Sequence, residues 1–333
     1  MKPHQDSLAP SSTIRRTGHA AVHSVERIVF TVPDIEPAQA FYTAFGLEVK
    51  RTDQQIDLYT HGNKHCWMSV VANGHPKALQ YLSLGIHPQD EDTFRRKIDA
   101  LELACAPHPL SSSGGLWLRS PDGTLLQLVV AGKVSPDCKT PKSPPPAPAR
   151  GDAAARMRSQ ASRVRPRWLS HVLVFTQDVS RMVDFCQDVL GLRLSDRSGE
   201  LVAFMHTPHG SDHHLLAFVK SDGPGLHHTS WDVGSLDEVG EGSEQMRAAG
   251  FTEGWGVGRH VLGSNYFYYA RDPWGSFAEY SFDIDFVSSD TDWVAGDYAP
   301  EDSFYLWGPA VPEWFVANTE LPTPPAVEAS QAA

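Results

Sequence analysis

The feature that most constrains the fold is an internal repeat. The segment VFTVPDIEPAQAFYTAFGL, which begins at Val29, aligns with VFTQDVSRMVDFCQDVLGL, which begins at Val174, and SPDGTLLQL around Gln127 aligns with DPWGSFAEY around Glu279. The first pair is offset by 145 residues, which is too long for the unit of a solenoid and fits two duplicated domains. A chain of 333 residues has room for both.

Each half contains the same order of elements. A strand-like run is followed by a helical segment, entered at Asp34 in the first half and at Asp178 in the second, and then by further strand-like runs. A strand, a helix and three more strands, given twice per domain, predict an α+β fold of two duplicated domains built from paired βαβββ modules. Their curved mixed sheets would enclose a pocket.

Composition divides the chain further. The run from Lys133 to Arg167 is rich in Pro, Ala and basic residues and too poor in large apolar residues to form a core. The aromatic-rich EDSFYLWGPAVPEWF predicts a docked tail, which we expect to cover core in preference to forming a lid over the pocket. The expected organisation is a disordered arm at 1–22, a first, non-catalytic domain at 23–133, a linker at 134–167, a second, catalytic domain at 168–286 and a docking tail at 287–333.

Charge and cysteine spacing limit the class of partner. The formal charge of −12 argues against a nucleic-acid or acidic-membrane binder, because such a chain would repel phosphate. No segment has the length and apolar character of a membrane span. Four cysteines without C-x-x-C spacing indicate neither a zinc site nor a disulfide framework. We therefore expect a cytoplasmic protein that acts on a small molecule.

The stretch GRHVLGSNYFYYARDPWGSFAE, from Gly258 to Glu279, predicts a hairpin around the turn DPWG. In such a hairpin Tyr269 and Glu279 face the same interior, with His260 arriving from the preceding loop. Taken alone, a carboxylate on a strand is as consistent with a solvated surface group as with a metal ligand.

Histidines interrupt strand-like runs throughout the second half. The repeat pairs His171 with Glu26, His228 with Tyr81 and Glu279 with Gln127, so the fold itself does not require the two imidazoles and the carboxylate. Two histidines and one carboxylate from different strands are what a facial metal site needs, with Fe(II) as the best-suited metal and Mn(II) second. A single strand histidine is more often a core or rim residue.

The second half resembles the catalytic domain of type I extradiol ring-cleavage dioxygenases of the vicinal oxygen chelate superfamily, such as the catechol 2,3-dioxygenases and 2,3-dihydroxybiphenyl 1,2-dioxygenases. The family signature is filled in order by Gly258, His260, Tyr269, Asp272, Pro273, Gly275 and Glu279. The pattern departs only at Tyr268, where the family has an aliphatic residue or Phe. At the level of the fold the resemblance covers about residues 23 to 286.

The resemblance implies a role for each matching residue. The iron ligands of the family fall on His171, His228 and Glu279. The acid–base histidine of the family falls on His214, and the residues that position its substrate fall on His260 and Tyr269. An imidazole that titrates near neutral pH suits proton transfer. The structural alternatives are a pocket-wall histidine at 214 and ordinary strand packing at 260 and 269.

Other polar and aromatic residues are weaker candidates. Strand alternation would turn His227 and His213 to the opposite face from their neighbours. The loop THPHGSDHH contains His206, His209 and Asp212, which would form a pocket rim or, as the preferred alternative, a solvated loop. Three tryptophans could line an aromatic pocket, although core packing explains them equally well: Trp231, Trp255 and Trp274.

The function implied is an Fe(II)-dependent extradiol dioxygenase that opens a catechol-type ring beside its vicinal hydroxyls and inserts both atoms of O2. Two alternatives stay open: a hydroquinone-type ring-cleavage dioxygenase, and a non-catalytic aromatic-binding or resistance protein of the same fold. The partners are then a catechol-type molecule and O2, and family members commonly form homo-oligomers. The sequence does not specify which catechol is bound.

Overall fold

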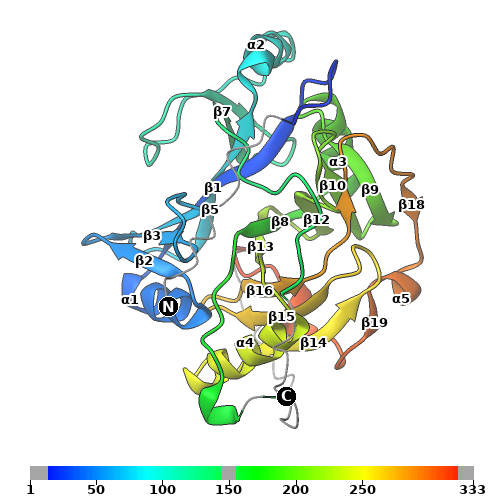
Figure 1. Ribbon diagram of the computed structural model, residues 1–333. Helices are drawn as coiled ribbons and strands as arrows, with labels where there is room; N and C mark the ends of the chain where they lie inside the picture. The colour runs from blue at the N-terminus through cyan, green and yellow to red at the C-terminus, as the bar shows by residue number, and fades with distance from the viewer. Residues whose placement is uncertain (1–13, 144–154, 156, 322–333) are drawn as a thin grey trace, which may run out of the picture.

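A computed structural model describes residues 14–143, 155 and 157–321. Two large mixed sheets dominate it, with the N-terminal half of the chain in one and the C-terminal half in the other (Figure 1). The change of sheet falls between Val130 and Leu169. The α+β class is confirmed, whereas the exact domain boundaries stay predictions.

The first sheet has seven strands in the order β2-β3-β4-β1-β5-β7-β6. Its strands and the accompanying helices are β1 (Val22–Val32), α1 (Ile35–Phe45), β2 (Glu48–Arg51), β3 (Gln55–Tyr59), β4 (Met68–Ala72), β5 (Ala78–Ile86), the 3-10 helix η1 (Pro88–Asp90), α2 (Glu91–Ala100), β6 (Leu116–Arg119) and β7 (Leu125–Val130).

The second sheet has ten strands in the order β18-β9-β10-β12-β8-β13-β16-β15-β14-β19. The elements of this half are η2 (Arg158–Gln160), β8 (Leu169–Thr176), α3 (Val179–Asp188), β9 (Arg193–Ser198), β10 (Val202–His206), β11 (Ser211–Asp212), β12 (Leu216–Lys220), β13 (Gly225–Asp232), α4 (Leu236–Ala248), β14 (Gly254–His260), β15 (Tyr266–Arg271), β16 (Phe277–Phe282), β17 (Phe286–Val287), β18 (Gly296–Asp297), α5 (Pro300–Ser303), β19 (Tyr305–Trp307) and η3 (Glu313–Val316).

The second half contains both expected βαβββ modules, joined where β8 pairs antiparallel with β13. In the first half the second module has only β6 and β7 after α2, and the third strand is reduced to an isolated bridge between Ala104 and Leu118. The helix starts agree with the sequence, because the Asp34 and Asp178 side chains accept backbone N–H groups of α1 and α3. The hairpin also forms as predicted, as β15 and β16.

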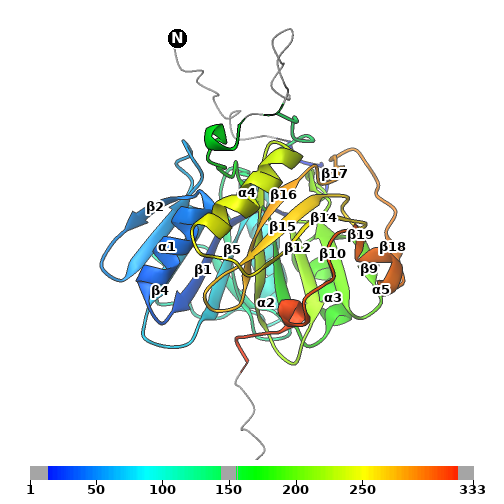
Figure 2. The same cartoon turned by 90° about the horizontal axis from the view of Figure 1, so that it is seen from below.

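The two halves pack through α1 and α4, which lie against each other (Figure 2). The rings of Phe45 and Tyr280 stack with centroids 4.0 Å apart, and the Tyr280 hydroxyl donates to the carbonyl of Phe45. The end of the expected linker joins this contact, because Val164 is buried and its N–H donates to Gln245. This contact ties the second half to the sheet that carries no candidate ligands.

The predicted arm, linker and tail lie partly outside the described residues. Residues 1–13 of the arm, 144–154 and 156 of the linker and 322–333 of the tail are not described. The described end of the arm packs against the body, where Arg15 pairs with Asp90. Strands near and within the tail pair with strands of the second half: β17, β18 and β19 pair with β11, β9 and β14.

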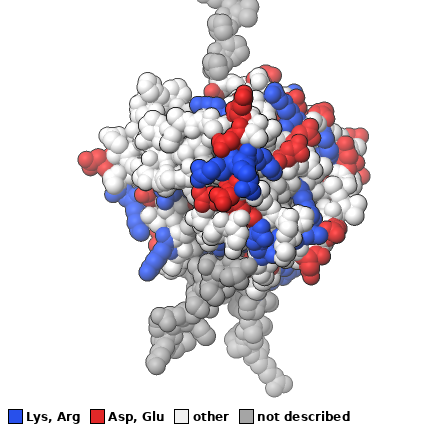
Figure 3. All heavy atoms as spheres, turned by 90° about the horizontal axis from the view of Figure 1, so that it is seen from above, with Lys and Arg blue, Asp and Glu red and all other residues white. Residues whose placement is uncertain are grey.

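Charged side chains of both signs are interspersed on the face drawn in Figure 3, over which neither sign forms a continuous field. Within residues 14–143 and 157–321, no helix has the length and apolar character needed to cross a membrane.

Candidate active site

Three neighbouring strands at the centre of the second sheet bring His171, His228 and Glu279 together. β13 lies between β8 and β16, and its Ser230 is paired with His171 on one side and with Glu279 on the other. Residues that are paired across strands point to the same face of a sheet, and so do residues two apart along one strand. His228 therefore shares a face with the other two.

The three side chains are buried, and their ligand atoms converge. Glu279 Oε2 lies 3.3 Å from His171 Nε2 and 3.7 Å from His228 Nε2. The three atoms all lie within 4.8 Å of one another. Glu279 Oε2 and His228 Nε2 are buried without a hydrogen-bond partner among the described residues. Buried polar atoms rarely stay unsatisfied, so the donor set fits a divalent metal ion that would bind all three atoms.

In each of the three side chains, the polar atom that is not a candidate ligand contacts a neighbouring polar group. Asn265 Nδ2 donates to Glu279 Oε1 over 3.0 Å. His171 Nδ1 lies 3.2 Å from the hydroxyl of Ser170. His228 Nδ1 lies 2.7 Å from Nδ1 of His227. Such outer contacts orient metal ligands and select their tautomers.

His227 corrects one sequence expectation, because it does not turn away from the site. Leu226 and His228 pair with consecutive residues of β8, which leaves His227 as the extra residue of a β-bulge. The bulge interrupts the alternation of side chains, so His227 lies beside His228 and lines the same cavity. Its Nε2 lies 2.8 Å from the carbonyl oxygen of Phe315, to which it donates.

His260 and Tyr269 form a hydrogen-bonded pair next to the candidate ligands. His260 is the last residue of β14 and does not lie in a preceding loop, which corrects the expected position. Its Nδ1 donates to the carbonyl oxygen of Phe304 over 2.9 Å, which leaves Nε2 to accept the Tyr269 hydroxyl, also at 2.9 Å. Tyr269 is paired with Glu279 across β15 and β16, as the hairpin predicted. Burial, and then the Glu279 carboxylate, raise the pKa of Tyr269 well above its usual value.

His214 packs against the candidate ligand His171, with ring centroids 3.9 Å apart. It lies in the loop before β12, which begins only at Leu216, and not in the strand itself. Burial, followed by the neighbouring histidines, lowers the pKa of His214 well below its usual value. His213 does not face away either, because its Nδ1 lies 3.1 Å from Nδ1 of His214. The alternation of side chains between two faces, on which the expectation for His213 rested, holds in a strand and not in this loop.

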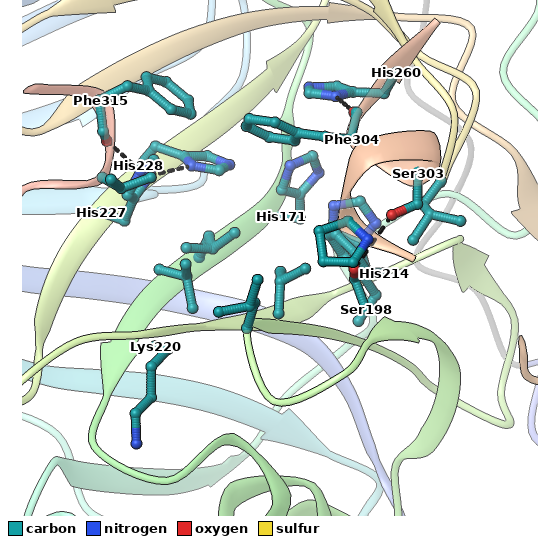
Figure 4. A pocket seen from close by; sticks show the side chains of 18 of the residues that line it. His171, Ser198, His214, Lys220, His227, His228, His260, Ser303, Phe304 and Phe315 are labelled. Carbon is teal, nitrogen blue, oxygen red and sulfur yellow. Dashed lines mark hydrogen bonds between the residues drawn. The ribbon is translucent and has the colours of Figure 1, made fainter. Parts of the chain in front are cut away.

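A cavity of about 390 Å³ opens beside these residues. His171, His214, His228 and His260 surround one end of it, and Lys220 lies at the other (Figure 4). Most of its wall is apolar, from Leu173, Leu201, Val202, Phe204, Val219, Leu262, Pro300, Phe304, Phe315 and Val316. Four of these belong to the tail, so the expectation that the tail only covers core was wrong: it also forms part of the pocket wall.

The remaining sequence candidates lie outside the cavity wall. His206, His209 and Asp212 are buried, so the expected solvated loop was wrong. The alternative expectation, a pocket rim, was wrong as well. His206 contacts Ser195, His209 packs against His87, and Asp212 accepts from Ser170.

The three tryptophans belong to the packing around the site. Trp231 is in the core, and Trp274 packs against that core. Trp255 stacks behind Tyr269, with ring centroids 5.6 Å apart. None of the three lines the cavity.

Sequence reasoning missed Asn265 as part of this site and preferred a core-covering role for the aromatic tail, part of which lines the cavity. Asn265 lies inside the signature stretch that we had singled out, so a polar residue between His260 and Tyr269 was the available signal. The carbonyl groups of Phe304 and Phe315 carry no sequence signal, because every residue has one.

Comparisons with known proteins agree on the kind of protein. Residues 168–280 match the family model of the glyoxalase/bleomycin resistance protein/dioxygenase superfamily. The chain is 49% identical over 317 residues to metapyrocatechase 2 of Cupriavidus necator, covering 95% of this chain and 97% of that protein.

Solved structures show the same fold. An Mn(II)-bound glyoxalase from Novosphingobium aromaticivorans is 25% identical with a TM-score of 0.70, over 92% of this chain and 95% of that one. A variant of homoprotocatechuate 2,3-dioxygenase from Brevibacterium fuscum is 19% identical with a TM-score of 0.72, over 93% of this chain and 84% of that one. At that identity the likeness to the dioxygenase structure supports the fold alone.

Fold and site thus define a two-domain protein of the vicinal oxygen chelate type with a candidate metal centre in its second half. The chain belongs to the extradiol ring-cleavage dioxygenases of this superfamily, because its identity to metapyrocatechase 2 extends over nearly the whole length of both chains.

Proposed function

We propose that this protein is an Fe(II)-dependent extradiol dioxygenase, which cleaves a catechol-type ring beside its vicinal hydroxyls and inserts both atoms of O2. The observation that carries the proposal is the buried group of His171, His228 and Glu279 at the end of an apolar cavity, where two of the ligand atoms have no hydrogen-bond partner within the described part of the chain. Metapyrocatechase 2 has a full-length relationship to this chain and supports the same substrate class.

We infer that the three buried side chains hold the metal. A facial site of two histidines and one carboxylate leaves positions open and is typical of Fe(II) oxygenases. Mn(II) is the alternative, because the same oxygen and nitrogen donors suit it. When bound, the metal would favour the deprotonated form of a catechol and bring it together with O2.

His260 and Tyr269 are proposed to position the substrate. Because His260 Nε2 accepts from the Tyr269 hydroxyl and its Nδ1 donates to the Phe304 carbonyl, both rings are fixed before any substrate arrives. A preorganised hydroxyl can shift its hydrogen bond to a substrate oxygen with little reorganisation. The raised pKa of Tyr269 keeps its proton in place for that bond.

His214 is proposed to accept and return a proton during ring opening. Its lowered pKa keeps the ring neutral at rest, so that one nitrogen is free to take a proton. The apolar wall of the cavity would exclude water from the reacting ring and suits an aromatic molecule.

The test is anaerobic loading of the purified protein with Fe(II) or Mn(II), followed by air and a panel of catechols and hydroquinones. We expect one O2 consumed per ring opened and a yellow ring-opened product from a catechol with Fe(II). No oxygen uptake with any diol would contradict the proposal, and cleavage of hydroquinones alone would favour the other class of ring-cleavage enzyme. A homo-oligomeric state and a cytoplasmic location stay predictions, to be checked by light scattering and cell fractionation.

A further inference from the structure

Behind His214 lies a chain of polar groups that leads away from the cavity. His214 Nδ1 is 3.1 Å from His213 Nδ1, and His213 Nε2 is 2.8 Å from Asp196 Oδ2. All three side chains are buried. His213 does not line the cavity, whereas His214 does.

The direction of these hydrogen bonds follows from the end of the chain. Asp196 Oδ1 already accepts the backbone N–H of Gly296 over 2.8 Å, and an ionised carboxylate can only accept. His213 must therefore donate from Nε2, and a neutral imidazole that is protonated there has its lone pair on Nδ1. Only one proton fits between the two facing Nδ1 atoms, so that proton belongs to His214. Nε2 of His214 is then left with a lone pair.

We propose that Asp196 and His213 are positioning residues that hold His214 in the tautomer with the proton on Nδ1 and the proton-accepting lone pair on Nε2. The role rests on the proposed function of His214 in proton transfer. A buried carboxylate that selects a histidine tautomer through a hydrogen bond is an established physical device, and reversing the tautomer removes most of the activity in serine proteases.

The docked tail helps to hold this arrangement. The Trp293 ring packs against His213 with centroids 5.3 Å apart, and its Nε1 donates to the carbonyl of Ser195, the residue before Asp196. The bond from Gly296 to Asp196 comes from the same segment. Packing and hydrogen bonds together leave His213 little freedom to rotate, which is what a tautomer-selecting partner requires.

The deciding variant is Asp196→Asn. The new amide oxygen can still accept from Gly296, but the amide nitrogen would donate to His213 Nε2. His213 would then carry its proton on Nδ1 and pass it toward His214, which would force the His214 proton onto Nε2. We expect nitrogen NMR of the metal-free, histidine-labelled protein to show this switch, with the His214 signals assigned by their loss in His214→Gln.

Kinetics of the Fe(II)-loaded enzyme give a second readout. For Asp196→Asn we expect kcat to fall by roughly 10²- to 10⁴-fold, with KM for catechol, bound iron and the thermal unfolding midpoint close to those of the wild type. Asp57→Asn is the control for a carboxylate-to-amide change: Asp57 lies on β3 of the first half, where it accepts from Ser69, and its substitution should leave kcat, KM and bound iron unchanged. A switched tautomer with unchanged kcat would overturn the proposal.

Two substitutions of His213 distinguish a hydrogen-bonding role of this side chain from simple packing. His213→Gln can donate its amide N–H to Asp196 and accept the His214 proton on its amide oxygen, so it should retain much of kcat and the Nδ1–H tautomer. His213→Leu fills the space without these bonds and should lose both. Equal behaviour of the two variants, or an unchanged His214 tautomer in Asp196→Asn, would refute the inference. The NMR result stands even if the wild type cleaves no catechol, an outcome that would refute the proposed function instead.

Discussion

The two halves of the molecule treat equivalent positions in opposite ways. Among the described residues, Glu279 of β16 has a buried oxygen without a hydrogen-bond partner, whereas Nε2 of Gln127, its counterpart on β7, lies within hydrogen-bond distance of Gly114 O, Ser113 O and Ser113 Oγ at 2.8, 3.2 and 2.9 Å. Asn265 precedes Glu279 by the same interval as Ser113 precedes Gln127. The first half thus satisfies the Gln127 amide internally, whereas the second half leaves an oxygen of Glu279 for another partner.

The aromatic neighbours repeat the contrast with nearly the same geometry. Tyr81 and Trp117 lie edge to face with centroids 5.0 Å apart, and their counterparts His228 and Tyr269 do the same at 5.1 Å. In the first half this pair joins a small apolar cluster with Val29 and Leu125. The fold therefore supports either a packed apolar centre or a metal centre at this place, and the side chains decide which.

The largest effect is expected from Glu279→Gln. Loss of the carboxylate removes the only anionic candidate ligand, and since even outer partners of metal ligands contribute about 10- to 100-fold in affinity, iron binding should weaken by at least about 100-fold. Gln127→Ala is the control and should leave iron binding unchanged. Elemental analysis after anaerobic loading measures both, and equal loss in the two variants would mean that the site is in the wrong half.

Tyr269→Phe should retain iron but lower kcat by roughly 100-fold, because it removes one positioned hydrogen-bond donor. Its counterpart change, Trp117→Phe, should leave kcat unaltered and lower the free energy of unfolding by about 1–2 kcal/mol through lost packing. Steady-state kinetics and urea unfolding of both variants check the pair. A fall in kcat for Trp117→Phe would show that the first half takes part in catalysis.

Asn265→Ala removes the donor that orients Glu279. We expect metal affinity to fall by about 10- to 100-fold, less than for loss of the ligand itself. Ser113→Ala, at the equivalent place in the first half, should change only stability. Competition with a metal chelator gives the affinities, and identical affinities for Asn265→Ala and the wild type would argue that Asn265 does not position the carboxylate.

An effect on stability alone, without any on metal binding or catalysis, is expected at Glu26, the counterpart of His171. Burial raises its pKa to about 7 from an ordinary value near 4.5. The folded state thus holds this proton more tightly than the unfolded state, so Glu26 destabilises the fold progressively as pH rises from about 4.5 to 7 and by a constant amount above that. Glu26→Gln should stabilise the protein by up to about 3 kcal/mol at pH 8 and by almost nothing at pH 4. Urea unfolding at the two pH values measures this, and an equal gain at both would contradict it.

Much of this comparison could be predicted from the sequence, and the rest depends on packing and long-range contacts that no sequence pattern specifies. The hairpin places Tyr269 opposite Glu279 as expected, because the turn DPWG fixes the register of its two strands. The position of His227 could not be predicted, because a β-bulge depends on how β13 packs against β8. The same holds for the contacts of Asp196 and of the Phe304 and Phe315 carbonyls, which join segments far apart in the chain.

The central claim is that one half of a duplicated fold binds metal and the other does not. Anomalous diffraction at the iron edge, on crystals of the protein loaded anaerobically with Fe(II), tests it most directly. The account predicts one strong peak per chain, in contact with His171 Nε2, His228 Nε2 and Glu279 Oε2, and none near Glu26 or Gln127. A peak in the first half, or no peak at the three buried atoms of the second, would contradict it.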